Sequence, residues 1–236
     1  MDQTLTYNKI INKALDLLLP NHCYLCDQTC SQTLCAQCRA DLPLSQSDHC
    51  HICALPLPSQ GICGECQKRK PSFDKCVTAY AYSGHIPTLI NDFKHREQHA
   101  VGRQLTTQLA VQLSQIQDIP DALLAVPLHW KNQLKRGFNQ ADVIARELGK
   151  RLQIPVKYLV TKQQASHHQQ QLTRRQRLAN NLQAFRCESQ LAIRHIALID
   201  DVVTTGATAE IISRLLKKEG VTKVTLCALA RTPKIH

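Results

Sequence analysis

Two adjacent acidic residues, Asp200 and Asp201, stand between a short apolar run and a loop of small, hydroxyl-bearing residues. The apolar run, residues 196–199, has the length and the β-branched content of a buried parallel strand. Carboxylates at a strand end repel phosphate, but they accept hydrogen bonds from sugar hydroxyls or hold Mg²⁺ through its water shell. The pair is therefore a candidate site for a diol or for a hydrated metal ion.

The loop after the acidic pair suits a phosphate group. Residues 209–220 repeat apolar side chains at helical spacing and end in a glycine, so the loop leads into the first turn of a helix. Free N–H groups and the helix dipole attract anions there, and threonine hydroxyls add donors. A phosphate site beside a diol site describes a ribose 5-phosphate; the alternative is a generic strand–turn–helix with an exposed acidic turn. The candidate ligand-binding residues are Asp200, Asp201, Val202, Val203, Thr204, Thr205, Gly206, Ala207 and Thr208.

A second loop carries several cations between a predicted strand, residues 121–126, and a predicted helix, residues 141–152. In an α/β sheet the carboxyl ends of the strands face the ligand crevice, where fixed cations would meet a pyrophosphate. A solvated basic loop is the alternative interpretation. The candidate pyrophosphate-binding residues are Pro127, Leu128, His129, Lys131, Arg136, Gly137, Asn139 and Gln140.

Four Cys-x-x-Cys pairs predict metal sites in the first third of the chain. Each pair can present two thiolates, and two pairs complete a tetrahedral zinc site. A module of about 45 residues with few large apolar side chains would hardly fold without metal. We therefore expect about two structural Zn²⁺ ions per chain. The predicted ligands are Cys23, Cys26, Cys35, Cys38, Cys50, Cys53, Cys63 and Cys66.

The spacing of the cysteine pairs favours one grouping of the ligands. Eight residues separate Cys26 from Cys35, and nine separate Cys53 from Cys63. These similar gaps favour pairing the first knuckle with the second and the third with the fourth, although a cross-braced arrangement remains open. The remaining cysteines and histidines of this region are interpreted as bystanders, although any of them could replace a ligand: Cys30, Cys76, His22, His49 and His51.

The formal net charge of +11 is concentrated in the second part of the chain. Residues 77–236 carry 22 Lys and Arg against 11 Asp and Glu, whereas the first 76 residues carry seven of each. Such a surplus indicates polyanionic partners, either phosphates or nucleic acid, and the alternative is a basic protein without such a partner. No run of 18 apolar residues occurs, and the N-terminus resembles neither a signal peptide nor a lipidation site. We therefore expect no membrane insertion and a cytoplasmic location.

Periodicity places the other elements and predicts an α/β protein with a parallel sheet. The expected parts are an N-terminal helix within residues 1–20, a double zinc ribbon over 21–68, a basic solvated linker over 67–75, and an α/β domain over 76–236. Within that domain we expect strands at 76–82, 121–126 and 221–230, helices at 86–93 and 98–116, and a polar lid over 161–181.

Taken together, these motifs resemble a known family. The stretch from Asp200 to Thr208 resembles the 5-phosphoribosyl-1-pyrophosphate (PRPP) signature of type I phosphoribosyltransferases. With the four cysteine pairs, Val-Pro-Leu at 126–128 and Arg-Gly-Phe-Asn-Gln at 136–140, nearly the whole chain resembles the ComF family of competence proteins. The resemblance implies a zinc ribbon on a phosphoribosyltransferase-like fold, PRPP with Mg²⁺ as ligand, and a hood that includes Gln169, Arg177 and Asn180. Ser166 and the lack of an arginine at 163 depart from the family pattern in that hood.

The resemblance implies a role in DNA uptake, on incoming single-stranded DNA and in some species alongside a helicase. Many purine salvage enzymes place an aspartate near the base, where this chain has Thr204, so PRPP binding is better supported than turnover. The leading hypothesis is a DNA-uptake protein that binds PRPP-like ligands and single-stranded DNA. The alternative is an active phosphoribosyltransferase in nucleotide or base salvage, and a weaker third is a partner adaptor acting through its ribbon.

Overall fold

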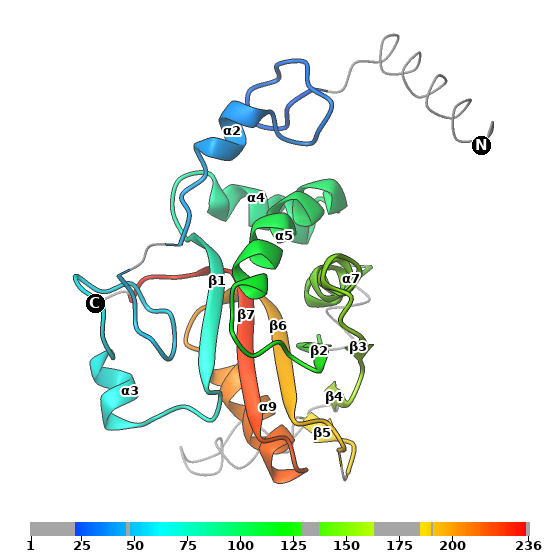
Figure 1. The fold of residues 1–236 in the computed structure, drawn as a ribbon. Coiled ribbons are helices and arrows are strands. Elements are labelled where there is room, and N and C mark those ends of the chain that lie inside the picture. Colours follow the sequence, from blue (N-terminus) through cyan, green and yellow to red (C-terminus); the bar gives the residue numbers. More distant parts are fainter. Residues whose placement is uncertain (1–21, 46–47, 129–136, 163–184, 190, 235–236) are drawn as a thin grey trace, which may run out of the picture. The chain divides into compact units, whose positions relative to one another are not determined.

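The computed structural model describes residues 22–45, 48–128, 137–162, 185–189 and 191–234. The chain divides into two compact units, residues 1–42 and 43–236, which are described separately (Figure 1). In the described part of the chain, no helix combines the length and apolar character that a membrane span requires. Several predictions fall outside the described residues, namely the N-terminal helix over 1–20, most of the polar lid, and the site residues His129, Lys131, Arg136, Gln169, Arg177 and Asn180.

The smaller unit is built around its cysteines. A loop carries Cys23 and Cys26, and the short helix α2, Ala36–Ala40, follows Cys35. Leu34 is fully buried, Cys23 is 2% exposed and Leu42 is 4% exposed, so the described part of the interior consists of little more than two leucines and cysteine side chains. A core this small supports a folded unit only with the help of a metal or another cross-link.

The larger unit is organised around a parallel sheet of five strands, which confirms the predicted α/β class. Its order across the sheet is β1-β7-β6-β2-β3. The inner strands carry unbroken apolar runs, as strands covered on both faces do, and residues 196–199 and 226–230 are fully buried. The strand bounds are Lys75–Ala81 (β1), Ala122–Ala125 (β2), Val156–Lys157 (β3), His195–Val203 (β6) and Lys223–Arg231 (β7).

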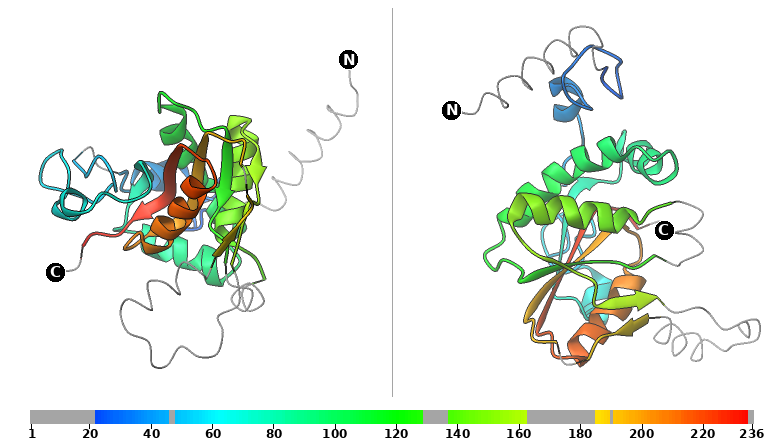
Figure 2. Two further views of the ribbon diagram at one scale, coloured as in Figure 1. Left: turned by 90° about the horizontal axis from the view of Figure 1, so that it is seen from below. Right: turned by 90° about the vertical axis from the view of Figure 1, so that its right-hand side faces the viewer.

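The direction of each crossover decides which face its helix covers. The connections from β1 to β2 and from β2 to β3 run one way across the sheet, whereas the connection from β6 to β7 runs the other way. Because parallel crossovers are right-handed, α5 and α7 lie on one face and α9 on the opposite face (Figures 1 and 2). The helix bounds are Gly64–Lys68 (α3), Ile86–His95 (α4), His99–Ser114 (α5), Gln140–Leu152 (α7) and Ala207–Lys218 (α9).

Three features differ from the sequence-based expectations. The strand that we predicted to end at Ile199, before the acidic pair, continues through the pair. It is β6, which pairs with β7 as far as Val203. The predicted solvated linker over 67–75 is wrong in its second half, since Phe73 is 3% exposed and Asp74 accepts hydrogen bonds from Val224 and Lys217. Two short antiparallel strands that the sequence did not predict, Val160–Lys162 (β4) and Phe185–Cys187 (β5), flank the polar lid.

The packing of α4 against α5 supplies a stability prediction. A methyl group added at Gly102 would lie 2.5 to 2.7 Å from ring atoms of Phe93, which is fully buried and cannot swing away. We expect Gly102→Ala to lower the free energy of unfolding by about 1–3 kcal/mol through overpacking. Denaturant titration measures the change, with Gly64→Ala as the control, because no atom lies within 4 Å of a methyl group there. Equal midpoints for the two variants would contradict the prediction.

Candidate functional site

The crevice of this sheet lies where β2 and β6 meet. The chain leaves β2 through α7 in one direction and leaves β6 through α9 in the other, so the loops after these strands separate at their carboxyl ends. Open α/β sheets bind ligands at such a switch point. The backbone N–H of Val126 donates to the carbonyl of Ile199 at 2.8 Å, which places the start of the second candidate loop next to Asp200. The fold therefore brings together the two loops that the sequence singled out.

The acidic pair is held by its own backbone and by a lysine from another element. Asp201 donates its N–H to Oδ1 of Asp200 at 2.9 Å, and Val202 donates to Oδ1 of Asp201 at 2.6 Å. The Nζ atom of Lys94, in the last turn of α4, lies 2.8 Å from Oδ2 of Asp201. The side chains of this lysine and aspartate are only 24% and 13% exposed. Lys94 is thus part of the crevice.

Sequence reasoning missed Lys94 as a site residue. A lysine in the last turn of a helix ordinarily complements the helix dipole, so nothing in its local sequence marks it as a ligand contact. Its main chain is fixed by Gln140 at the start of α7, whose side-chain amide donates to the Lys94 carbonyl at 3.4 Å. The side chain can therefore meet either Asp201 or an anionic group bound in the crevice.

The carboxyl group of Asp200 holds its proton more tightly than an ordinary aspartate does. Burial, together with the neighbouring charge of Asp201, raises the pKa of Asp200 to about 7, although the N–H of Asp201 opposes this shift. In the ligand-free protein near neutral pH, Asp200 is therefore partly protonated. A bound cation would favour its ionised form.

This shift predicts a dependence of stability on pH. Because the pKa is raised in the folded state, Asp200 contributes stability at low pH that is lost as the pH rises through about 7. We expect the free energy of unfolding of the ligand-free protein to fall between about pH 4 and pH 7 relative to that of Asp200→Asn, and to level off at higher pH. Denaturant titrations of the two proteins across this range measure the difference, and parallel pH profiles would contradict the prediction.

A glycine in a left-handed conformation turns the chain from β6 into α9. Gly206 precedes α9 with φ of +74°, a left-handed conformation that favours glycine. Thr204 and Thr205 are exposed, and Oγ1 of Thr205 accepts from the N–H of Ala207 at 3.3 Å. The hydroxyls and the first N–H groups of α9 thus border the same loop.

The described part of the second loop is held by side chains that bond to the backbone. Asn139 caps α7 by accepting from the N–H of Ala141 at 3.1 Å, and its amide donates to the carbonyl of Val126 at 3.0 Å. Gln140 is 2% exposed and bonds to the main chain of Lys94. Gly137 has φ of +74°. Asn139 and Gln140 therefore hold the loop in place, while Pro127 and Leu128 line the groove beside it.

That groove continues from the described part of the second loop to β4. It is lined by Phe138, Asp142, Arg146, Tyr158 and Lys162, among others. The hydroxyl of Tyr158 donates to Asp142 at 2.8 Å, and Arg146 pairs with the same carboxylate at 3.0 Å. Tyr158 remains 59% exposed, so an aromatic face lies beside two cations.

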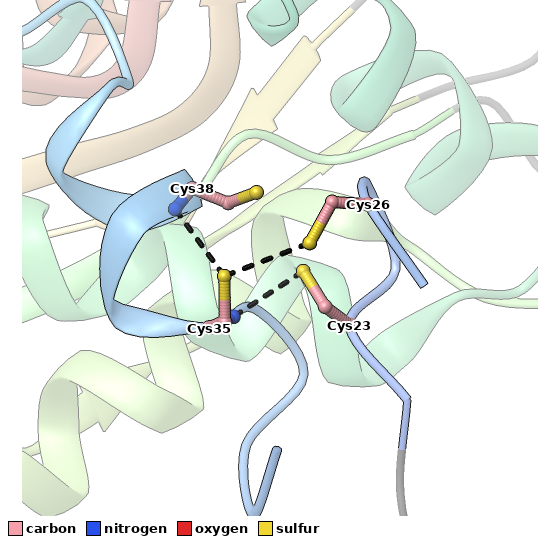
Figure 3. A group of neighbouring side chains, drawn as sticks. All are labelled: Cys23, Cys26, Cys35 and Cys38. Atoms are coloured by element: carbon pink, nitrogen blue, oxygen red, sulfur yellow. Dashed lines mark hydrogen bonds between the residues drawn. The ribbon is translucent and has the colours of Figure 1, made fainter. Parts of the chain in front are cut away.

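The eight predicted zinc ligands form two clusters, grouped as the sequential arrangement predicts. Cys23, Cys26, Cys35 and Cys38 form one cluster, whose side chains converge, and within each cluster all four sulfur atoms lie within 4.8 Å of one another (Figure 3). The Sγ atoms of Cys26 and Cys35 are 3.7 Å apart. A tetrahedron with Zn–S bonds of about 2.3 Å has edges of about 3.8 Å, so the spacing fits zinc.

The second cluster, Cys50, Cys53, Cys63 and Cys66, belongs to the larger unit and is buried throughout. Its Cys53 and Cys63 sulfur atoms are also 3.7 Å apart. Burial raises the pKa of the Cys50 thiol, but N–H donors from Cys63, Cys53 and Ile52 outweigh it and hold that pKa to about 7. Backbone donors of this kind stabilise the thiolate form, which is the form that binds zinc. The sulfur spacing of both clusters fits structural zinc.

Comparison with known families identifies two matching segments of the chain. Residues 14–67 match the family described as a double zinc ribbon domain. Residues 105–234 match the family described as a phosphoribosyl transferase domain. The two matched segments together contain both cysteine clusters, the acidic pair and the loop that follows it.

Curated relatives match nearly the full length of the chain. Competence protein F of Haemophilus influenzae is 31% identical over 220 residues, which are 84% of this chain and 96% of that protein. The DNA utilization protein YhgH of Escherichia coli is 29% identical over 92% of this chain and 99% of its own length. Competence protein ComFC of Bacillus subtilis is 24% identical over 84% of this chain and 89% of its own length.

Proposed function

Because this chain belongs to the ComF family, in which a double zinc ribbon precedes a phosphoribosyltransferase domain, we propose that it is a DNA-uptake protein that binds a PRPP-like ligand and single-stranded DNA. The names of its relatives refer to competence and DNA utilization, which supports that role. We place its action in the cytoplasm, where a DNA-processing helicase is a candidate partner.

One observation carries the ligand proposal. The acidic pair and the glycine loop of β6 lie at the switch point of the sheet, next to the loop that follows β2. In this arrangement Asp200 and Asp201 would accept the ribose hydroxyls, and the loop from Thr204 to Thr208 would hold the 5-phosphate. Mg²⁺ would neutralise the pyrophosphate, and the residues present fit it, because two carboxylates stand near the carboxyl end of β6. Lys94 is positioned to pair with the negative charge of the pyrophosphate that Mg²⁺ leaves unneutralised.

The crevice supports binding better than turnover. Phosphoribosyl transfer needs an acceptor held and activated beside the ribose. Thr204 occupies the loop position where many purine enzymes carry an acid, and its hydroxyl is not a general base at neutral pH. Glu210, the next acid along the chain after Thr204, is already bonded to Ser72 and Arg214. A salvage phosphoribosyltransferase is the alternative, and release of pyrophosphate from PRPP with an added base would favour it.

The DNA part of the proposal rests on charge and on the groove beside the crevice. Arg146 and Lys162 border an exposed tyrosine, and the second part of the chain carries twice as many basic as acidic residues. Cationic side chains that contact the phosphate backbone bind all sequences alike. Because few aromatic side chains are available to stack on the bases, such binding shows little sequence preference. We therefore propose that single strands are bound mainly through their phosphates.

Counterion release gives the test of this proposal. If about six phosphates are neutralised, affinity for a single strand should fall by about two orders of magnitude or more between 50 and 200 mM salt. Fluorescence anisotropy with labelled single-stranded oligonucleotides of two unrelated sequences measures this, and both should give the same slope. An affinity that does not change with salt concentration, or no binding at low salt, would refute the DNA part of the proposal.

A further inference from the structure

A buried arginine joins the second zinc cluster to the strand that carries the acidic pair. Arg231, the last residue of β7, is 8% exposed. Its Nε donates to the carbonyl of Cys53 at 3.2 Å, and its Nη1 donates to the carbonyl of Val203 at 3.0 Å. Val203 is the last residue of β6 and stands immediately before the phosphate loop. One guanidinium therefore bridges a zinc-knuckle carbonyl and the root of that loop.

The chain that leaves the second cluster also holds the far side of the loop. Ser72, six residues after Cys66, donates both its N–H and its hydroxyl to Glu210, the latter at 3.0 Å. Glu210 lies in the first turn of α9 and donates its own N–H to the carbonyl of Gly206 at 2.8 Å. Although burial raises the pKa of Glu210, Ser72 and Arg214 lower it below its ordinary value. The carboxylate is thus a fixed anchor for the start of the helix.

An aromatic side chain fills the space between these two attachments. Phe73 is 3% exposed, and its ring lies 3.7 Å from the position that a Cβ atom at Gly206 would take. Asp74, the next residue, accepts from the N–H of Val224 and from Lys217 at 2.8 Å each. Residues 72–74 therefore attach the end of the ribbon to both β7 and α9.

From these contacts we propose that the second zinc cluster is a positioning element for the phosphate-binding loop, with Arg231 and Glu210 as its points of attachment. The loop of residues 204–206 has no secondary structure of its own and is exposed or half-buried, so the elements at its two ends fix its shape. Loss of zinc from this cluster would release Cys53 and the segment up to Ser72. The first cluster belongs to the smaller unit and serves as the comparison. This inference rests on the proposed function only for the identity of the ligand.

Two matched variants of the full-length protein test the proposal. Cys63→Ser with Cys66→Ser removes half of the second cluster, and Cys35→Ser with Cys38→Ser does the same to the first. Metal analysis should show one zinc fewer in each variant. We expect the second-cluster variant to lose hydrogen-exchange protection over residues 203–210 and to bind PRPP–Mg²⁺ about tenfold or more weakly, because a displaced loop loses its preorganised donors. The first-cluster variant should match the wild type in both respects.

A milder variant covers the case in which loss of the second cluster unfolds the domain. Arg231→Lys keeps the charge but cannot bridge two carbonyls with a planar fork, so it should retain both zinc ions and still weaken PRPP binding severalfold. Lys234→Gln is its control, because Lys234 pairs with Glu65 only at the exposed surface.

The outcomes separate the proposal from the function on which it builds. Unchanged exchange protection over 203–210 in a folded protein that has lost its second zinc would overturn the proposal, as would wild-type affinity in Arg231→Lys. If the wild type binds no PRPP, the proposed ligand is wrong, and the hydrogen-exchange comparison still decides whether the second cluster holds the loop.

Discussion

Replacing Asp200 and Asp201 together with asparagine is expected to abolish PRPP–Mg²⁺ binding while leaving the fold intact. Each carboxylate would accept a ribose hydroxyl, and a hydrogen bond to a charged group contributes about 1.5–3 kcal/mol. The loss of two such bonds corresponds to a decrease in affinity of more than about a hundredfold. Calorimetric titration of the folded double variant measures this effect.

The fold should survive because asparagine keeps the structural contacts of both positions. The side-chain oxygen that accepts from the N–H of Asp201, and the one that accepts from Val202, are retained as amide oxygens. Lys94 loses its partner, but its side chain is 24% exposed and can turn toward water. Asp118→Asn, at the opposite end of the sheet and 60% exposed, is the matched control and should bind as the wild type does. Unchanged affinity in the folded double variant would refute the assignment of these residues.

Removal of zinc is expected to have the largest effect on stability. Zinc contributes about 10 kcal/mol or more to the folding of small structural sites. Among the described residues, the interior of the smaller unit is Leu34 and Leu42 with cysteine side chains, an apolar core too small to replace the ion once it is removed. We expect metal analysis to find about two zinc ions per chain, and a chelator to make residues 22–42 accessible to trypsin at Arg39.

The sheet supplies the internal control for that experiment. Its strands are covered by α5, α7 and α9 rather than by metal, so the trypsin site after Lys223, the first residue of β7, should remain uncut after chelation. Loss of zinc from the second cluster should expose trypsin sites after Lys68 and Arg69. Identical trypsin patterns before and after complete zinc removal would contradict a structural role for the metal.

The sequence predicted most of the elements that carry the site. The apolar run at 196–199, the glycine at 206 and the amphipathic helix after it are local signals, and local signals fix a strand–loop–helix unit. The cysteine spacing predicted the ligand grouping for a similar reason, because two knuckles separated by eight or nine residues can close on one ion. The acidic pair was placed just after its strand, whereas pairing with β7 extends the strand through it.

What the sequence did not predict depends on contacts between distant residues. Lys94 is 107 positions from its partner Asp201, and Ser72 is 138 positions from Glu210. Residues 67–75 have the composition of a solvated linker, yet a single phenylalanine and an aspartate attach them to the sheet. The strands β3, β4 and β5 have two or three residues each, too few to show a period.

Calorimetric titration of the zinc-loaded, full-length protein with PRPP, with and without Mg²⁺, tests the central claim most directly. The account predicts saturable binding of one PRPP per chain that requires Mg²⁺ and is lost in the Asp200→Asn, Asp201→Asn variant. Repeating the titration with a single-stranded oligonucleotide present shows whether DNA competes for the same crevice. Absence of PRPP binding by the folded protein in the presence of Mg²⁺ would contradict the account.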